Sequence, residues 1–346
     1  MATTQRAVVV DSPGVAALVH DRAIPKLRDD YMLVKTVAVA VNPTDWKHID
    51  NWVLESGPLV GCDYAGIVEE VGPKVTKEFK KGDRVCGMAH GCNVSQHEDG
   101  TFAEHIVVKG DVQMKIPENL SFEDAATLGV GLITVGQGLY RSLGLSLPTE
   151  PSGNGEFVLI YGGSTATGAL GIQFAKASGY RVITTCSPHN FDMVRSLGAD
   201  AVFDYRDPDC GEKIRDYTND RLAIAWDTIS LPVSAEVCAA ALTTGPNAKY
   251  SCLLQVEFPR ADIKPTVTLA YTAFNEEFRI MNRVVPVVPG DFDFTKSFIE
   301  ICRKLLATGK VKVHSPRVNK GLEGVLDGLE LLRKDKISGE KLVYVV

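Results

Sequence analysis

The chain has 346 residues, of which 45% are hydrophobic and 23% charged, and its formal net charge at pH 7 is −6. The length allows two domains with full-sized cores, and the acidic balance argues against nucleic acid or an anionic membrane as the main partner. No apolar run approaches the ~18 residues that span a bilayer, and the segment MATTQRAVVV lacks the apolar stretch of a signal peptide. The eight cysteines are scattered without a C-x-x-C pair, which is typical of reduced thiols, so we expect a cytoplasmic protein.

The first part of the chain contains short valine-rich runs separated by Gly, Pro and Asp turns. These runs lie at residues 6–10, 33–41, 65–71, 102–108 and 112–116. Frequent short strands predict a compact β-barrel-like domain over roughly the first 120 residues. A capping-box-like start at Ser121 leads into the glycine-punctuated segment 128–140, which we expect to be a helical bridge between domains.

From residue 157 onward, strands and helices are predicted to alternate, which indicates a doubly wound parallel sheet. The expected strands are 157–161, 181–185, 201–203, 222–227, 249–254 and 266–270, with helices near 168–178, 190–197, 209–218 and 234–243. Two further helices are expected at 294–308 and 321–334. The terminal strand 341–346 has no open sheet of its own, so we expect it to return to the first domain.

The stretch around the first of these alternating strands is the most informative in the chain. A buried strand, 157–161, stops at Gly162-Gly163, and a helical pattern follows within the string GGSTATG. Such a turn presents free N–H groups and the positive end of a helix to a phosphate. An ordinary strand–turn–helix connection is the alternative, and the placement between strand and helix favours nucleotide binding.

The end of the second strand bears on which nucleotide binds. A NAD-binding unit would carry Asp or Glu there to hold the ribose 2′-hydroxyl, whereas this chain has Cys186-Ser-Pro-His-Asn190 and no acid. Neutral donors accept a 2′-phosphate that a carboxylate would repel. The segment therefore favours NADP(H), although a plain turn of Ser, Pro and Asn is the alternative interpretation.

Taken together, these motifs resemble the medium-chain dehydrogenase/reductase superfamily. The resemblance rests on Val41-Asn-Pro-Thr-Asp-Trp-Lys47, Gly61-Cys-Asp-Tyr-Ala-Gly66, Val71-Gly72, Gly82-Asp-Arg-Val85, Phe102-Ala-Glu-His105 and the turn at 162–173, and covers nearly the whole chain. It implies an α/β protein in which a GroES-like, β-barrel-type catalytic domain is joined to a doubly wound Rossmann domain. The implied domains are 1–125 with 275–346, and 126–274, with a cofactor in the cleft between them.

A narrower resemblance is to the fungal trans-acting enoyl reductases that serve polyketide synthases and polyketide–nonribosomal peptide hybrid synthetases. It rests on Tyr161-Gly-Gly-Ser-Thr-Ala-Thr167, Cys186-Ser-Pro-His-Asn-Phe-Asp192, Val202-Phe-Asp-Tyr-Arg206 and Ser338-Gly-Glu-Lys-Leu342. Gly168 departs from this subgroup toward the general superfamily form, which leaves the quinone-reductase branch as an alternative. The resemblance implies NADPH as cofactor and the acyl carrier domain of a synthase as partner, in secondary-metabolite biosynthesis.

The resemblance also implies the site residues. Catalysis would rest on Lys47 and Thr134. NADPH would be bound by Thr44, Asp45, Trp46, Lys47, Gly162, Gly163, Ser164, Thr165, Ala166, Thr167, Ser187, Pro188, His189, Asn190, Tyr205, Leu253, Leu254, Ile337 and Ser338. Substrate would be bound by Thr134, Gln137, Tyr140, Thr272, Ala273, Phe274 and Asn275. Asp227 at a strand end is either near a ligand or caps the next turn.

Zinc-dependent relatives hold a catalytic metal with Cys and His ligands, and the corresponding positions here are Asn42 and Cys62. Three or four converging ligands are needed for tetrahedral zinc, and His90, His97 and His105 fit no metal-binding spacing. We therefore expect no metal.

Without a Lewis acid, the remaining chemistry is hydride delivery to an activated double bond, which needs donors for an enolate oxygen and a proton for the α-carbon. Lys47 and Thr134 are the polar candidates, although Lys47 as residue type alone could be a solvated lysine. The predicted function is NADPH-dependent reduction of an acyl-carrier-bound enoyl thioester. The alternatives are a quinone or free-enone reductase and a non-enzymatic NADPH-binding scaffold. Whether the protein is a monomer or a homodimer stays open.

Overall fold

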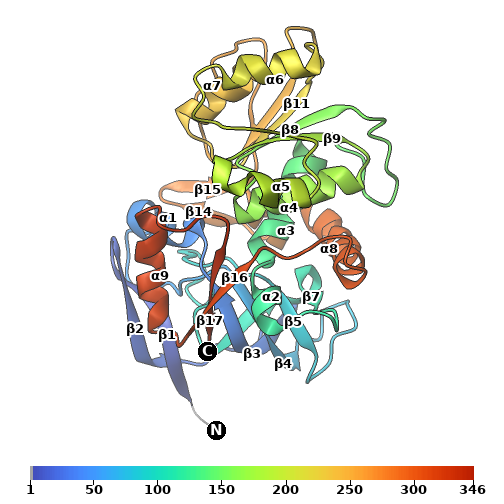
Figure 1. The fold of residues 1–346 in the computed structure, drawn as a ribbon. Helices are drawn as coiled ribbons and strands as arrows, with labels where there is room; N and C mark the ends of the chain where they lie inside the picture. Colours follow the sequence, from blue (N-terminus) through green and yellow to red (C-terminus); the bar gives the residue numbers. More distant parts are fainter. Residues whose placement is uncertain (1–2) are drawn as a thin grey trace. The chain divides into compact units, whose positions relative to one another are not determined.

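The computed structural model describes residues 3–346, which fall into two compact units (Figure 1). The first unit comprises the described residues up to Ile133, with Tyr271–Ala307 and Val313–Val346. The second comprises Thr134–Ala270 and Thr308–Lys312. For comparison, the division expected from the sequence was 1–125 with 275–346, and 126–274.

The first unit is built on a seven-stranded sheet in the order β16-β17-β3-β4-β5-β7, with β6 paired to β3, and on the two-stranded sheets β1-β2 and β14-β15. Its strands are β1 (Thr4–Ser12), β2 (Val15–Ala23), β3 (Tyr31–Ala40), β4 (Asp63–Val71), β5 (Arg84–Met88), β6 (His105–Lys109), β7 (Met114–Lys115), β14 (Phe278–Ile280), β15 (Arg283–Val285), β16 (Pro316–Lys320) and β17 (Lys341–Val345). The helices are α1 (Pro43–Asn51), η1 (Gly110–Val112), α2 (Phe122–Ala126), α8 (Asp291–Ala307) and α9 (Gly324–Arg333).

The core of this unit joins elements from both ends of the chain. Buried valines of β1 and β3 meet Val325 and Leu329 of α9 and Leu342 of β17 in one apolar cluster. Strand β17 runs antiparallel to β3, with Val343 opposite Ala40. The prediction that the terminal strand returns to the first domain is therefore confirmed.

The second unit is a six-stranded parallel sheet in the order β10-β9-β8-β11-β12-β13. Its strands are β8 (Phe157–Tyr161), β9 (Arg181–Thr185), β10 (Ala201–Phe203), β11 (Ile224–Asp227), β12 (Lys249–Cys252) and β13 (Thr266–Val267). Its helices are α4 (Ala166–Ala177), η3 (Pro188–Asn190), α5 (Phe191–Ser196), α6 (Cys210–Thr218) and α7 (Pro232–Ala241), with the π-helical segment η2 (Gly136–Ser142). The order reverses between β8 and β11, which is where doubly wound sheets bind ligands, so the predicted Rossmann topology is confirmed.

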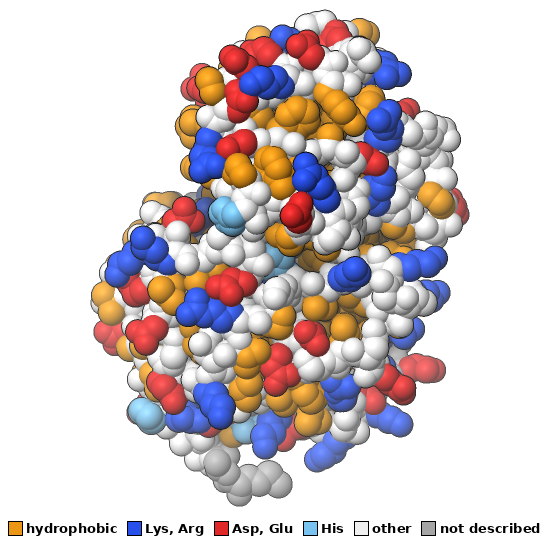
Figure 2. All heavy atoms as spheres, viewed as in Figure 1, with side chains coloured by type: hydrophobic (Ala, Val, Ile, Leu, Met, Phe, Trp, Pro, Cys, Tyr) orange, Lys and Arg blue, Asp and Glu red, His pale blue; other side chains and the backbone are white. Residues whose placement is uncertain are grey.

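Two helical elements cross the boundaries between the units. They are α3 (Gly129–Val135) and the 3₁₀ turn η4 (Ala270–Phe274). No helix within residues 3–346 is long and apolar enough to cross a membrane. On the face shown in Figure 2, basic and acidic side chains are interspersed, without one broad patch of either sign.

Some predicted strands were wrong in their bounds. The expected strand at 102–108 begins only at His105. Phe102 and Ala103 are fully buried, but Ala103 forms only an isolated β-bridge with Ala7 and is not part of a continuous strand pairing. Residue 112 belongs to a 3₁₀ turn, which leaves β7 with two residues. The expected strand at 266–270 ends at Val267, where the chain turns toward η4.

Candidate active site

The glycine-rich turn of the second unit follows β8 directly. Gly162 has φ +84°, and a Cβ there would lie 2.8 Å from side-chain atoms of Thr228 and Ile229. A Cβ on Gly168, inside α4, would lie 2.3 Å from the carbonyl oxygen of Gly162. Glycine at both positions therefore lets α4 approach the turn closely, as a nucleotide-binding unit requires.

Helix α4 is capped by a residue of the predicted site. The Thr165 hydroxyl accepts a hydrogen bond from the Gly168 N–H at 2.9 Å, so that α4 begins at Ala166. Ser164, Thr165, Ala166 and Thr167 are all partly exposed at this end of the helix. Backbone N–H groups and the positive end of the helix dipole are thus available to an anion.

The segment after β9 places hydroxyl groups where the sequence lacks an acid. Ser187 Oγ donates to the Tyr205 hydroxyl at 3.4 Å, while Pro188 and His189 are exposed and Asn190 is buried. The nearest carboxylate in sequence to Tyr205, Asp204, is held by Arg206 at 2.9 Å. That hydrogen bond lowers the pKa of Asp204. Arg206 was not assigned from the sequence, although it ends the string Val202-Phe-Asp-Tyr-Arg206.

Residues at the ends of β11 and β12 complete this edge of the sheet. The Thr228 hydroxyl donates to Tyr161 O at 2.7 Å and lies 3.3 Å from the Thr165 hydroxyl. Ser230 Oγ accepts from the Leu253 N–H at 2.8 Å, which fixes the start of the Leu253-Leu254 segment. Sequence reasoning missed Thr228 and Ser230; the strand end at Asp227 was the signal that could have found them.

Asp227 itself has a structural role. It is fully buried and accepts hydrogen bonds from Tyr250 at 2.8 Å, Ser234 at 2.6 Å and the backbone N–H groups of Ile229 and Ser230, each at 2.9 Å. Of the two interpretations of Asp227 left open by the sequence, the structure supports the cap of the following turn.

Thr134, Gln137 and Tyr140 lie in α3 and η2, in the second unit. Thr134 and Gln137 are each 6% exposed, and among residues 3–346 the buried Nε2 of Gln137 has no hydrogen-bond partner. The Tyr140 hydroxyl instead donates to Phe174 O at 3.3 Å and lies 3.0 Å from Ser178 Oγ, at the end of α4. A π-helical turn with an unsatisfied buried amide is an arrangement that often marks a functional position.

Helix α1 of the first unit carries the Thr44–Lys47 segment. Asp45 is 1% exposed and accepts from the Asn42 N–H at 2.7 Å, so its carboxylate stabilises the helix start. Burial raises the pKa of Asp45 to about 7. The half-buried Lys47 ammonium lies 5.7 Å from the Trp46 ring centroid, and burial lowers the pKa of Lys47.

Thr44 belongs to a cluster of hydroxyl and imidazole groups. Its hydroxyl lies 2.7 Å from the Tyr271 hydroxyl, and the Nδ1–H of His48 donates to Thr44 O at 2.8 Å. The His90 ring stacks on Tyr271 with centroids 4.1 Å apart. Burial lowers the pKa of His48 to about 4 and that of His90 well below its usual range, so both imidazoles are neutral at pH 7.

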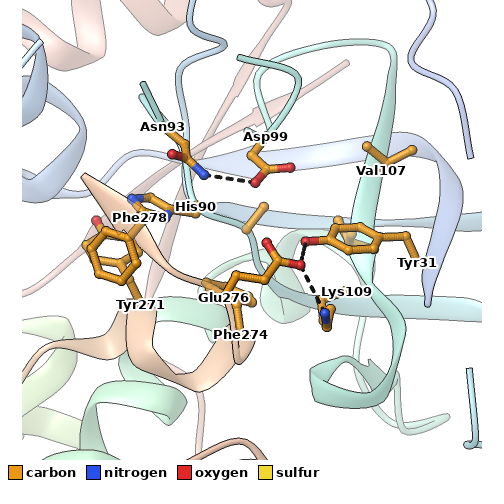
Figure 3. Close-up of a pocket in the computed structure, with 12 residues that line it drawn as sticks. Tyr31, His90, Asn93, Asp99, Val107, Lys109, Tyr271, Phe274, Glu276 and Phe278 are labelled. Carbon is orange, nitrogen blue, oxygen red and sulfur yellow. Dashed lines mark hydrogen bonds and ion pairs between the residues drawn. The ribbon is translucent and has the colours of Figure 1, made fainter. Parts of the chain in front are cut away.

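The predicted substrate residues 272–275 form a short segment that is anchored by hydrogen bonds at Thr272 and at the following residue, Glu276. The Thr272 hydroxyl donates to Asp291 at 2.6 Å, and Glu276 accepts from the Tyr31 hydroxyl at 2.6 Å and from the Lys109 ammonium at 2.9 Å. Ala273 and Phe274 are buried, whereas Asn275 is exposed. Figure 3 shows the contacts of Glu276 with Tyr31 and Lys109. They border a cavity of about 10 Å³, which has room for roughly one water molecule.

Ile337 and Ser338 lie between α9 and β17 in the first unit. Ile337 is partly buried against the same apolar cluster as Trp46, and Ser338 is exposed. In the first unit, Ile337 and Trp46 pack against the same apolar cluster, and the Thr44 hydroxyl contacts Tyr271, which precedes residues 272–275. The second unit brings together the glycine-rich turn, the Ser187–Tyr205 pair and Leu253.

The groups around Asn42 and Cys62 do not form a zinc donor set. Asn42 Oδ1 accepts a hydrogen bond from the Lys341 ammonium at 2.9 Å, and Asn42 Nδ2 donates to Asp63 at 2.9 Å. The amide oxygen that could bind a metal is therefore already hydrogen-bonded to a cation. Burial raises the pKa of the Cys62 thiol well above its usual range, which disfavours the thiolate that zinc binds. No group of three or more His, Cys, Asp or Glu within residues 3–346 could hold a metal ion.

Two family matches agree with the two-unit division. Residues 28–118 match the family "Alcohol dehydrogenase GroES-like domain", and residues 166–250 match the family "Zinc-binding dehydrogenase". Among solved structures, an alcohol dehydrogenase superfamily protein from Novosphingobium aromaticivorans has a TM-score of 0.82 at 23% identity, covering 99% of this chain and 100% of that one. The CurK enoyl reductase has a TM-score of 0.76 at 18% identity, covering 99% of each chain. These likenesses show the shared fold.

Curated relatives are much closer in sequence. The trans-enoyl reductase TOXD of Cochliobolus carbonum is 60% identical over 276 residues, which cover 80% of this chain and 92% of the relative. The trans-enoyl reductase resD of Aspergillus sclerotiorum is 47% identical, covering 99% of this chain and 100% of the relative. The chain therefore belongs to the trans-enoyl reductases, a family of oxidoreductases within the medium-chain dehydrogenase/reductase superfamily.

Proposed function

We propose that the protein is an NADPH-dependent, trans-acting enoyl reductase. It reduces the α,β-double bond of an acyl chain carried on the acyl carrier domain of a polyketide synthase or polyketide–peptide hybrid synthetase. Membership of the trans-enoyl reductase family supports the reaction class. The single structural observation that carries the proposal is the glycine-rich turn, with α4 capped by Thr165 and the neutral Ser187–Tyr205 pair beside it.

NADPH is favoured over NADH by the groups around Ser187. A ribose 2′-phosphate needs donors and no competing carboxylate. Ser187 and Tyr205 supply hydroxyl groups, and the Asp204 carboxylate is neutralised by Arg206 in an ion pair of 2.9 Å. Arg206 is therefore a further candidate for contact with the 2′-phosphate.

The bound cofactor would supply the hydride that reaches the β-carbon of the enoyl thioester. Charge then develops on the thioester oxygen, and the protein must offer donors there. Lys47 suits this role because burial lowers its pKa and weakens its hydration while leaving three N–H donors on a flexible stem. Thr134, 6% exposed on α3, would supply a hydroxyl donor, and the amide of Gln137 would bind the acyl group.

The test is NADPH oxidation by the purified protein with three substrates: an enoyl pantetheine thioester, the same acyl group on a carrier protein, and a simple quinone. We expect turnover of both thioesters, fastest on the carrier, and a preference for NADPH over NADH. Fast reduction of the quinone with little turnover of either thioester would contradict the proposal and favour a quinone reductase.

Variants separate the enzyme from a cofactor-binding scaffold. Lys47→Ala and Thr134→Ala should lower kcat on the carrier-bound thioester while NADPH still binds. If both variants still allowed a partner synthase to form the reduced product, the protein would act as a scaffold.

A further inference from the structure

A buried carboxylate, Asp63, joins segments that are far apart in the sequence. Asp63 is the first residue of β4 and fully buried, and it forms an ion pair with Lys341, the first residue of β17, whose side chain is 4% exposed. The Lys341 ammonium also donates to Asn42 Oδ1 at 2.9 Å and to Thr127 O at 3.0 Å. Its three N–H donors are therefore matched by three oxygen acceptors.

The other bonds of Asp63 reach two helices. Asp63 accepts from Asn42 Nδ2 at 2.9 Å, next to the start of α1, and from the Val130 N–H at 2.5 Å, in the first turn of α3. We call Asn42, Asp63, Thr127, Val130 and Lys341 the Asp63 junction. A Cβ on Gly129 would lie 2.6 Å from Asp63 Oδ1 and 2.1 Å from Gly87 O, so the start of α3 is packed tightly against the junction.

The Asn42 side chain, at the start of α1, makes tertiary hydrogen bonds in place of the usual bonds to its own helix. An Asn at the N-cap ordinarily accepts hydrogen bonds from the second or third N–H of its helix through its side chain, whereas here the Asp45 N–H donates to the backbone oxygen of Asn42 at 3.1 Å. The side-chain oxygen of Asn42 is bonded to Lys341 and its side-chain nitrogen to Asp63. The side chain therefore stabilises the position of α1 against β4 and β17 instead of the helix itself.

We infer that the Asp63 junction positions α1 and the start of α3 within the first unit, and with α1 the residues Thr44 and Lys47. Asn42, Asp63 and Lys341 are thus positioning residues for the reaction. This inference rests on the proposed function, because it assigns its effect to residues of that site. A displacement of about 1 Å in such residues can lower the rate by about 100-fold, which makes a rigid junction useful.

Two variants test the junction. Removing one charge alone would leave a buried charge unpaired and destabilise folding, whereas Asp63→Asn with Lys341→Met removes both charges. Asn42→Ala keeps the ion pair and, because the amide does not cap α1, removes the ties to α1 without removing a cap; it also takes one acceptor from Lys341 and one donor from Asp63. We expect both variants to fold and to lower kcat on the enoyl thioester by about tenfold or more, with a smaller change in the KM for NADPH.

Arg333→Met is the matched control. Arg333 of α9 also forms an ion pair with α1, at Asp50, with a distance of 2.8 Å, but both side chains are about one quarter exposed. We expect wild-type kcat in this variant, since solvent reaches this pair and screens its charges, unlike those of the fully buried junction.

Each result decides the inference. Wild-type kcat in either folded junction variant would overturn it, and so would failure of Asn42→Ala to fold, which would limit the junction to a role in stability. If the wild type reduces a quinone and no thioester, the proposed function fails. The same variants are then measured with the quinone, so that the junction is judged separately.

Discussion

Gly168→Ala provides a sharp test of the nucleotide-binding turn, because two effects of opposite sign compete. Replacing a helix-interior glycine with alanine ordinarily stabilises a protein by about 0.5–1 kcal/mol. Here the new Cβ would lie 2.3 Å from Gly162 O and 3.0 Å from Gly163 Cα. An ordinary carbon–oxygen contact is about 3.3 Å, so α4 and the turn would have to separate by roughly 1 Å.

The steric effect should win. Overpacking of this kind costs about 1–3 kcal/mol, which leaves a net destabilisation of about 0–2.5 kcal/mol, centred near 1 kcal/mol. The same shift would lengthen hydrogen bonds from the turn to a phosphate. A hydrogen bond to a charged group contributes about 1.5–3 kcal/mol, so losing one should weaken NADPH binding at least about tenfold.

Thermal unfolding and fluorescence titration with NADPH measure both effects. We expect a lower Tm than the wild type and a weaker Kd for NADPH in Gly168→Ala. Thr165→Ser serves as the control, because it keeps the hydroxyl that caps α4 and adds no atom near the turn. A Gly168→Ala protein that melts higher and binds NADPH normally would refute the close-approach argument.

Three further predictions concern Ser187, next to the nucleotide-binding turn, and Lys47 and Asp45 of α1. Ser187→Asp should shift the preference from NADPH toward NADH, because a carboxylate repels the 2′-phosphate; the ratio of kcat/KM for the two cofactors measures it, and an unchanged ratio would place the 2′-phosphate elsewhere. Lys47→Met should lower kcat on the enoyl thioester by about 10²-fold while the variant still binds NADPH, and full activity would remove Lys47 from catalysis. Asp45 has a pKa raised to about 7 in the folded protein from 3.8, so its contribution to stability is present below about pH 4 and lost as the pH rises through 7. The free energy of unfolding of Asp45→Asn, relative to that of the wild type, should therefore rise as the pH increases from 4 to 7. Urea unfolding at several pH values measures this difference, and a difference that does not change with pH would contradict the raised pKa.

The Rossmann strands were predictable because buried parallel strands form continuous apolar, β-branched runs. Strands 157–161, 181–185 and 201–203 have the predicted bounds. Helix α1 was not predicted, since PTDWKHIDN has few apolar residues, although Asn42 at the N-cap, Pro43 in the first turn and Asp45 are local signals of a helix start. Strand β2 was missed because its residues are mostly exposed or half-buried and show little alternation.

Only those parts of the candidate site that lie within one continuous segment of the sequence could be predicted. The turn at 162–168 and the missing acid at 187–190 are local features of the sequence. The contact of Thr44 with Tyr271 spans 227 positions, and that of Asn42 with Lys341 spans 299, so periodicity and spacing could not reveal them. The roles of Arg206 and Thr228 likewise depend on which strands become neighbours in the sheet.

The place of β17 has a consequence for how the protein is made. β17 lies between β16 and β3, with Val343 opposite Ala40, and Lys341 pairs with Asp63. The sheet of the first unit therefore stays incomplete on the ribosome until Lys341–Val345 emerges, whereas residues 134–270 contain all six strands of the second unit. The inserted unit can finish folding first, and until β17 emerges, residues 38–40 of β3 expose an unpaired strand edge that other chains could bind.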